Sequence, residues 1–87
     1  STTNIEPLGE ITVFPNPTKG NVFVNLEQIE AEKVNIQIQT INGQAIFAES
    51  MMGGQVQELN VSNIPAGIYF VNIESKGSST VKKLVIN

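Results

Sequence analysis

The 87-residue sequence predicts an all-β domain in which antiparallel strands form two packed sheets. Short segments rich in Val, Ile and Phe recur at intervals of about 8–12 residues, which is typical of sandwiches and barrels. Gly, Asn, Pro and Ser separate these segments and supply turns. No long stretch has the 3.6-residue periodicity of a helix. The predicted strands cover residues 11–14, 21–26, 33–39, 44–49, 56–61, 68–75 and 80–86.

The first two strands are defined by the segment between them. Pro15 and Pro17 have no backbone N–H to donate to a neighbouring strand, so they mark a sheet edge or an exit from the sheet. Gly20 is expected to permit the turn that follows. The second strand then places Val22, Val24 and Leu26 on one face, because side chains alternate along a strand. A polar loop at residues 28–32, with room for one helical turn, is expected to connect this strand to the third.

The third strand has the cleanest pattern, because Val34, Ile36 and Ile38 alternate with polar residues at a period of two. One face of this strand is therefore expected to be buried. The strand leads into Asn42-Gly43, a dipeptide preferred by type I′ turns, in which both central residues adopt positive φ. Residues 44–49 are accordingly predicted to return as the hairpin partner.

The last three strands follow the same alternation. In the fifth, Gln57, Leu59 and Val61 share one face, and in the sixth Tyr69, Val71 and Ile73 do so. A corner at residues 62–67 precedes Tyr69, whose hydroxyl is expected to bond to nearby backbone. A turn at residues 76–78 introduces the seventh strand, and we expect Asn87 to be the natural C-terminus. Together these elements predict a seven-stranded antiparallel immunoglobulin-like β-sandwich.

The composition indicates one folded domain without catalytic equipment. Its net charge is −3, and every acidic residue is Glu and every basic residue Lys, so no basic surface for nucleic acid is expected. No apolar run approaches the roughly 20 residues that span a bilayer, so no direct membrane insertion is expected. Cys and His are both absent, which removes the usual zinc ligands and nucleophile–base pairs. We therefore expect no enzyme activity, no metal and no cofactor.

Two groups of side chains can be interpreted either as a binding site or as ordinary parts of the fold. Glu27, Glu30 and Glu32 cluster in one loop, but they lack the Gly-punctuated spacing of calcium loops, so a solvated loop is the better interpretation. The aromatic side chains are candidates for a sugar-stacking platform, but packing in the core is favoured. Phe23, opposite in phase to its neighbours, is the one aromatic expected to be exposed. The aromatic residues are Phe14, Phe23, Phe47, Tyr69 and Phe70.

Lys82 and Lys83 interrupt the apolar last strand and also have two interpretations. Lysines on edge strands guard against pairing with other chains. An edge strand is equally a template for a partner, so the lysine pair is a candidate recognition element. The sequence physics leaves both interpretations open.

Four segments, taken in order, resemble a known family. They are Val13-Phe14-Pro15-Asn16-Pro17-Thr18-Lys19-Gly20, then Ile41-Asn42-Gly43-Gln44, then Ile64-Pro65-Ala66-Gly67-Ile68-Tyr69-Phe70-Val71, and then Lys82-Lys83-Leu84-Val85-Ile86. Their combination is similar to the type A C-terminal sorting domain of the type IX (Por) secretion system. The resemblance covers residues 10–87, and residues 1–9 are expected to be a linker from an upstream cargo domain.

The resemblance implies a non-catalytic secretion signal of Bacteroidetes-type bacteria. The cargo would reach the periplasm first and then the cell surface or the medium. Implied partners are the outer-membrane translocon, its shuttle protein, and a sortase-like surface peptidase that cuts the linker before Ile11. The residues expected to carry recognition by the translocon are Pro15, Asn16, Pro17, Gly20, Gly67, Tyr69, Lys82 and Lys83. The alternative is a carbohydrate-binding or adhesive immunoglobulin/fibronectin-like module of a secreted enzyme.

Overall fold

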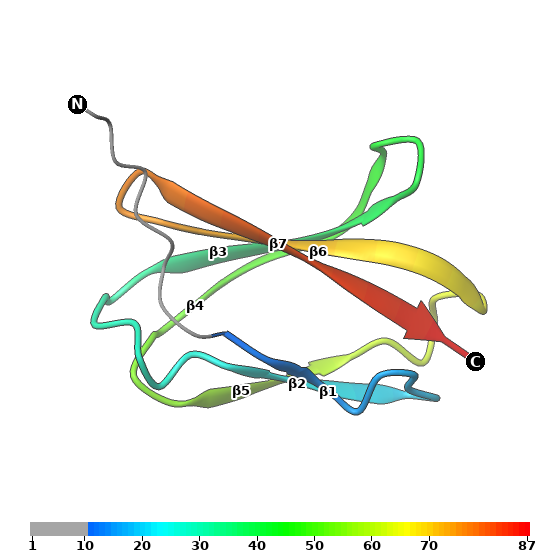
Figure 1. Cartoon of the computed structure of the whole chain (residues 1–87), viewed down its shortest axis with the longest axis horizontal. Coiled ribbons are helices and arrows are strands. Elements are labelled where there is room, and N and C mark those ends of the chain that lie inside the picture. The colour runs from blue at the N-terminus through cyan, green and yellow to red at the C-terminus, as the bar shows by residue number, and fades with distance from the viewer. Residues whose placement is uncertain (1–10) are drawn as a thin grey trace.

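The computed structural model describes residues 11–87, which form seven strands in two antiparallel sheets (Figure 1). One sheet has the order β1-β2-β5 and the other the order β4-β3-β6-β7. The predicted linker, residues 1–9, and Glu10 lie outside the described residues. The strands are β1 (Val13–Phe14), β2 (Asn21–Asn25), β3 (Val34–Thr40), β4 (Ala45–Met51), β5 (Val56–Asn60), β6 (Gly67–Ser75) and β7 (Ser78–Ile86).

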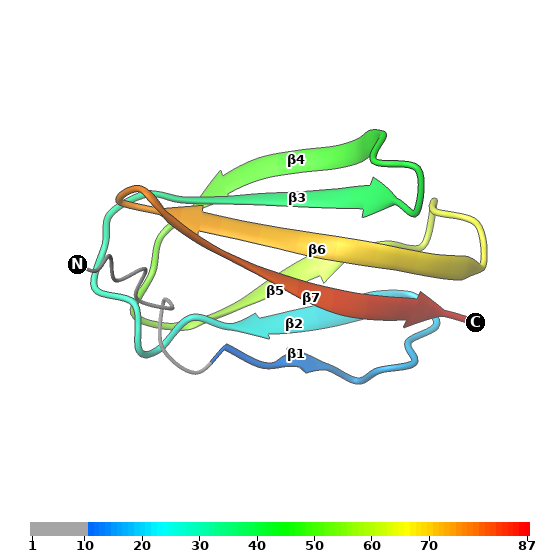
Figure 2. The same cartoon turned by 45° about the horizontal axis from the view of Figure 1, so that its top comes forward.

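The two sheets pack face to face, with β1 and β7 on the same side of the sandwich (Figure 2). This arrangement confirms the predicted immunoglobulin-like β-sandwich. Within residues 11–87, no helix has the length and apolar character needed to cross a membrane.

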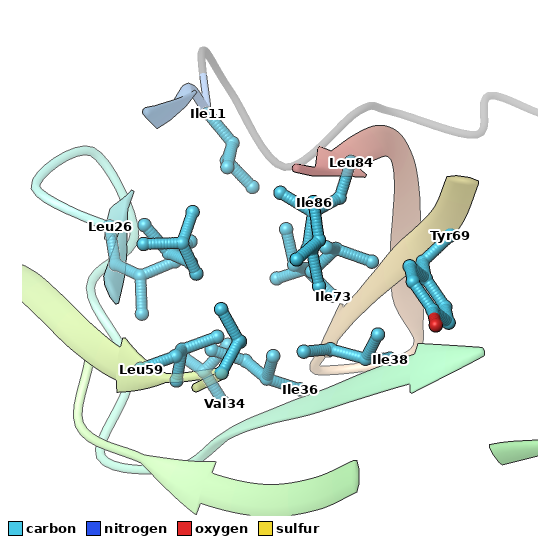
Figure 3. Close-up of a cluster of buried hydrophobic side chains, with 14 of the residues drawn as sticks. Ile11, Leu26, Val34, Ile36, Ile38, Leu59, Tyr69, Ile73, Leu84 and Ile86 are labelled. Atoms are coloured by element: carbon cyan, nitrogen blue, oxygen red, sulfur yellow. The ribbon is translucent and has the colours of Figure 1, made fainter. Parts of the chain in front are cut away.

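The core lies between the sheets and is built from the residues that the alternation placed inward (Figure 3). Val34, Ile36 and Ile38 of β3 are fully buried, as the period of two predicts. The predicted inward residues of β2 and β6 are buried as well. Ile11 also packs into the core, although the strand that was expected to begin there starts at Val13.

The β3–β4 hairpin forms as predicted, but its turn is of a different type. The Gly43 N–H donates to the Thr40 carbonyl at 2.9 Å, so the central residues of this turn are Ile41 and Asn42. Gly43 has φ +93°, whereas Asn42 does not have positive φ. The register of the hairpin also shifts between Ile38 and Gln39. The predicted type I′ turn at Asn42-Gly43 is therefore wrong, and the loop is one residue longer, as in hairpins that combine a turn with a left-handed glycine.

The type I′ geometry occurs instead between β6 and β7. Ser75 pairs with Ser78, which leaves a two-residue loop of Lys76 and Gly77. These residues have φ +52° and +82°, so both central positions are left-handed. The tight turn lets β7 begin at Ser78, two residues before its predicted start at Thr80.

The prediction that most aromatic side chains pack in the core is wrong. Among the described residues, Tyr69 is the one aromatic side chain that is buried, and Phe47 packs against the core from its margin. Phe14 is 41% exposed, more than Phe23, which was expected to be the exposed aromatic. The space between the sheets is filled by Val, Ile and Leu, whose compact branched side chains pack well on pleated surfaces.

Candidate recognition site

The site begins with Asn16, whose side chain lies along the outer edge of β7. Its Nδ2 donates a hydrogen bond to the Lys83 carbonyl at 2.8 Å. The Val85 N–H in turn donates to Asn16 Oδ1 at 2.9 Å. One side-chain amide thus supplies a donor and an acceptor to the edge of β7, as a peptide group of a neighbouring strand would.

Thr18 continues this contact with its own backbone. Its N–H donates to the Val85 carbonyl at 2.9 Å, and the Asn87 N–H donates to the Thr18 carbonyl at 2.8 Å. Thr18 is therefore bridged to Ile86 in a parallel sense, and it is buried. We call residues 16–18 the β7 latch, because they close the outer edge of β7 from Lys83 to Asn87.

Pro15 precedes the β7 latch and Pro17 lies within it, and both are exposed. Both peptide bonds that precede them are cis. Neither proline has a backbone N–H, so neither position has a donor that needs a partner. The predicted exit from the sheet is confirmed, and the same segment turns back onto β7.

Gly20 supports the corner before β6 through its backbone. Its carbonyl accepts a hydrogen bond from the Val61 N–H at 2.8 Å. A Cβ placed on Gly20 would lie 4.0 Å from the Cβ of Ser62, and Gly20 does not have positive φ. Gly20 lies in the bend that precedes β2, as expected, but neither its φ nor the space around it demands a glycine there.

The predicted tyrosine corner is confirmed. The Tyr69 hydroxyl donates to the Pro65 carbonyl at 2.6 Å. Gly67 precedes it with φ +157° and pairs with Ile86 of β7. A Cβ on Gly67 would meet the Tyr69 ring at 3.5 Å, an ordinary contact, so its conformation is the stronger constraint. Because Tyr69 is only 8% exposed, it shapes the corner from within and offers little surface to a partner.

The two lysines of β7 point to opposite faces. Lys82 shares the inward phase of Leu84 and is half-buried. It lies beside Asn16 in a groove lined also by Ile11, Thr12, Val13 and Lys83. An inward-pointing charge is one way in which edge strands avoid pairing with other chains. Lys83 is exposed on the outer face of the sheet, opposite Phe70 of β6, so only Lys83 presents its charge outward there.

The structure therefore unites part of the predicted set. Asn16 and the two lysines meet at β7, and Gly67 joins the same strand through Ile86. Thr18, which also contacts β7, was not among the predicted site residues, although it directly follows the second proline and precedes the turn. No signal in the sequence indicated that Asn16 forms hydrogen bonds with Lys83 and Val85, which are far away along the chain.

Acidic side chains of the described residues are not gathered into a metal site. No group of three or more His, Cys, Asp or Glu residues in it is arranged to hold a metal ion. Glu27, Glu30 and Glu32 are all exposed. The arrangement at β7 offers hydrogen bonds, a lysine charge and apolar area, which are the means of binding a macromolecule.

Asn16→Ala is expected to lower the free energy of unfolding by about 1–2 kcal/mol, because two hydrogen bonds to β7 are lost at a partly solvated site. Urea denaturation followed by circular dichroism measures this change. Lys19→Ala, an exposed change in the same loop, is the control and should shift stability by less than about 0.5 kcal/mol. Equal effects of the two substitutions would show that the two Asn16 side-chain hydrogen bonds contribute nothing to stability.

Comparison with known proteins adds the family. A family model described as secretion system C-terminal sorting domain matches residues 12–87. An ulvan lyase of Nonlabens ulvanivorans is 25% identical over 83 residues, covering 94% of this chain. An endo-acting ulvan lyase of Formosa agariphila is 30% identical over 78 residues, covering 88% of this chain. In both cases the chain spans only 15% of the relative's length.

Proposed function

The chain belongs to the secretion system C-terminal sorting domain family, and we propose that its folded surface at β7 is what the type IX machinery reads. Members of this family are sorting signals for secretion, not catalytic domains. The observation that carries the proposal is the β7 latch. Segments that are 67 residues apart in sequence meet there and form one surface, which exists only in the folded domain.

The partners that we propose are the outer-membrane translocon and its shuttle protein. Lys83 is exposed on β7, and Pro15 and Pro17 are exposed beside it on the latch segment. These residues are available to a protein surface. Lys82 and Tyr69 face inward and are proposed to support this surface rather than contact the partner.

For the cargo, we propose a secreted polysaccharide-degrading enzyme joined before residue 1. Two relatives that carry a similar segment are ulvan lyases, and the chain corresponds to a small part of each. The gene sequence upstream of Ser1 tests this proposal directly. An upstream region without an enzyme domain would overturn it.

The fate that we propose is transit through the periplasm, passage across the outer membrane, and removal of the domain at the surface by a sortase-like peptidase. Cleavage is placed in residues 1–9, ahead of the first core residue, Ile11. Mass spectrometry of a surface-released reporter would give the cut site. A cut within the sandwich, or a reporter that retains the whole domain, would contradict this placement.

The decisive experiment fuses the full chain behind a periplasmic reporter. We expect the reporter to reach the surface or medium in a bacterium that has the type IX system, and to remain in the periplasm when the translocon gene is deleted. The control reporter carries an immunoglobulin-like domain of similar size from an unrelated protein. Retention of the fusion in the competent host, or export of the control, would refute the sorting function.

A second candidate function is supported by one observation. Phe14 and Phe23 stack with ring centroids 5.6 Å apart and an interplanar angle of 24°. Glu58 pairs with Phe23 across strands and accepts a hydrogen bond from Asn21 Nδ2 at 2.6 Å. Aromatic faces beside polar groups are suited to sugar rings. A glycan-array signal that Phe14→Ala abolishes and Phe70→Ala preserves would establish glycan binding, and the absence of any signal would exclude this candidate.

A further inference from the structure

We propose that the outer face of β6 and β7 docks an apolar, acidic surface of a partner protein in the secretion machinery, and this inference rests on the function proposed above. The face consists of four apolar side chains around one lysine. We call it the apolar face and define it as Ile68, Phe70, Val81, Val85 and the central Lys83.

The pairing of the two strands makes these residues neighbours. Ile68 lies opposite Val85, and Phe70 lies opposite Lys83. Val81 and Val85 flank Lys83 along β7 on the same side, because alternate residues of a strand share a face. The five side chains therefore form one contiguous surface.

This surface is apolar where a solvated sheet face is ordinarily polar. Ile68 is 50% exposed and Val81 is 57% exposed, while Phe70 and Val85 are half-buried. Clustered exposed apolar side chains mark interaction sites more often than scattered ones do. Aromatic side chains such as Phe70 are also enriched at the centres of protein interfaces.

The latch determines which part of β7 a partner reaches. Asn16 and Thr18 occupy the outer edge of β7 from Lys83 to Asn87. A partner strand cannot add to that part of the edge while the latch is closed. The face of the sheet remains accessible, so docking is proposed on the face rather than by strand addition.

The charge of Lys83 indicates which kind of partner surface fits the apolar face. Lys83 is the one charged residue of the apolar face, and its neighbours there are Phe70, Val81 and Val85. Burying this ammonium group is favourable only if a carboxylate meets it. The partner surface is therefore expected to combine apolar side chains with a Glu or Asp near its centre.

A second copy of this chain does not meet these requirements. Facing the apolar faces of two copies brings their Lys83 ammonium groups together. Beside the apolar face, the same sheet face carries polar residues of β3 and β6, with Gln37 and Asn72 in one cross-strand row and Asn35 and Glu74 in the next. Pairing Lys83 with Glu74 of a second copy would lay apolar side chains on these amides, which favours a different protein as the partner.

The test compares variants of the full chain fused to the exported reporter. Ile68→Thr/Val81→Thr removes apolar area at outward positions but keeps β-branched side chains, and Lys83→Glu reverses the central charge. Each is expected to lower export about tenfold, the effect of losing roughly 1.4 kcal/mol of binding. The matched controls are Val56→Thr, at a position 40% exposed on β5, and Lys33→Glu, exposed before β3. Both controls should export within about twofold of the parent.

The outcomes separate the two proposals. Thermal unfolding of each variant confirms that the domain is folded, so a loss of export reports a loss of binding. Normal export of both apolar-face variants would overturn the docking inference and leave the sorting function intact. Retention of the parent fusion would overturn the sorting function itself. A parent dimer in light scattering that Ile68→Thr/Val81→Thr dissociates would assign the face to a second copy and overturn the inference.

Discussion

Removal of residues 82–87 is expected to unfold the domain rather than delete a separate signal. These residues place Leu84 and Ile86 in the core, where they are almost completely buried (Figure 3). They also pair with Gly67–Val71 of β6 and receive the β7 latch. Truncating a single buried Leu to Ala costs about 2–5 kcal/mol, and small domains are stable by only about 5–15 kcal/mol. Losing both side chains and the strand should exceed that margin.

Far-UV circular dichroism and a urea titration measure this outcome. The truncated chain is expected to lack a cooperative unfolding transition, and Leu84→Ala to retain one at reduced denaturant concentration. Lys83→Ala is the control, because Lys83 is exposed and its change should leave the midpoint nearly unchanged. A truncated chain that unfolds cooperatively with parental stability would contradict this account.

This expectation changes how a secretion experiment on such a domain is interpreted. Loss of export after a C-terminal deletion is the expected result whether the last strand contacts the translocon or only completes the sandwich. Substitutions on the outer face, such as Lys83→Glu, separate these two explanations because they leave Leu84 and Ile86 in place.

Much of the fold was predictable because it depends on local alternation. The period of two in β3 and β6 identified the buried faces, and a shift of one residue would have exposed all of Val71, Ile73 and Tyr69. The turn type was not predictable in the same way. Asn42-Gly43 has the composition of a type I′ turn, but a register shift in the hairpin moved the turn by one residue. Lys76-Gly77 has type I′ geometry, although Lys is a less typical residue than Asn at the first central position of such a turn.

For the candidate site, the sequence predicted individual residues but not the contacts between them. The family resemblance identified Asn16, and the interruption of an apolar strand identified Lys83, but their contact depends on how the segment after β1 meets β7. The side chains of Lys82 and Lys83 point to opposite faces because successive residues of a strand alternate. Since Leu84 faces the core, Lys82 must share its face and Lys83 must point outward. The exposure of Phe14 was missed because Val13 and Phe14 are adjacent apolar residues, and the sequence does not mark which of them faces outward.

Gly53→Ala is expected to have the largest effect on stability of any substitution at a glycine described here. Gly53 is buried in the β4–β5 turn, and its N–H donates to the Ala31 carbonyl at 2.9 Å. A Cβ there would overlap the Ile29 carbonyl oxygen and approach the Ala31 carbonyl oxygen to 3.1 Å. Both atoms belong to the backbone of the β2–β3 loop, whose Ile29 side chain is buried in the core. Relief of the overlap would displace that loop, at a cost of about 3 kcal/mol.

Gly54→Ala is the matched control, because Gly54 is the next residue and has φ +84° with open space where a Cβ would lie. It should cost only the roughly 1 kcal/mol of placing an L side chain in the left-handed region. The difference between the two urea midpoints isolates the steric effect at Gly53. Because the connection between β4 and β5 lies at the opposite end of the sandwich from the connection between β1 and β2 (Figure 2), a Gly53→Ala fusion below its unfolding temperature should still be exported. Equal destabilisation by the two substitutions would show that the β2–β3 loop yields to the new side chain without cost.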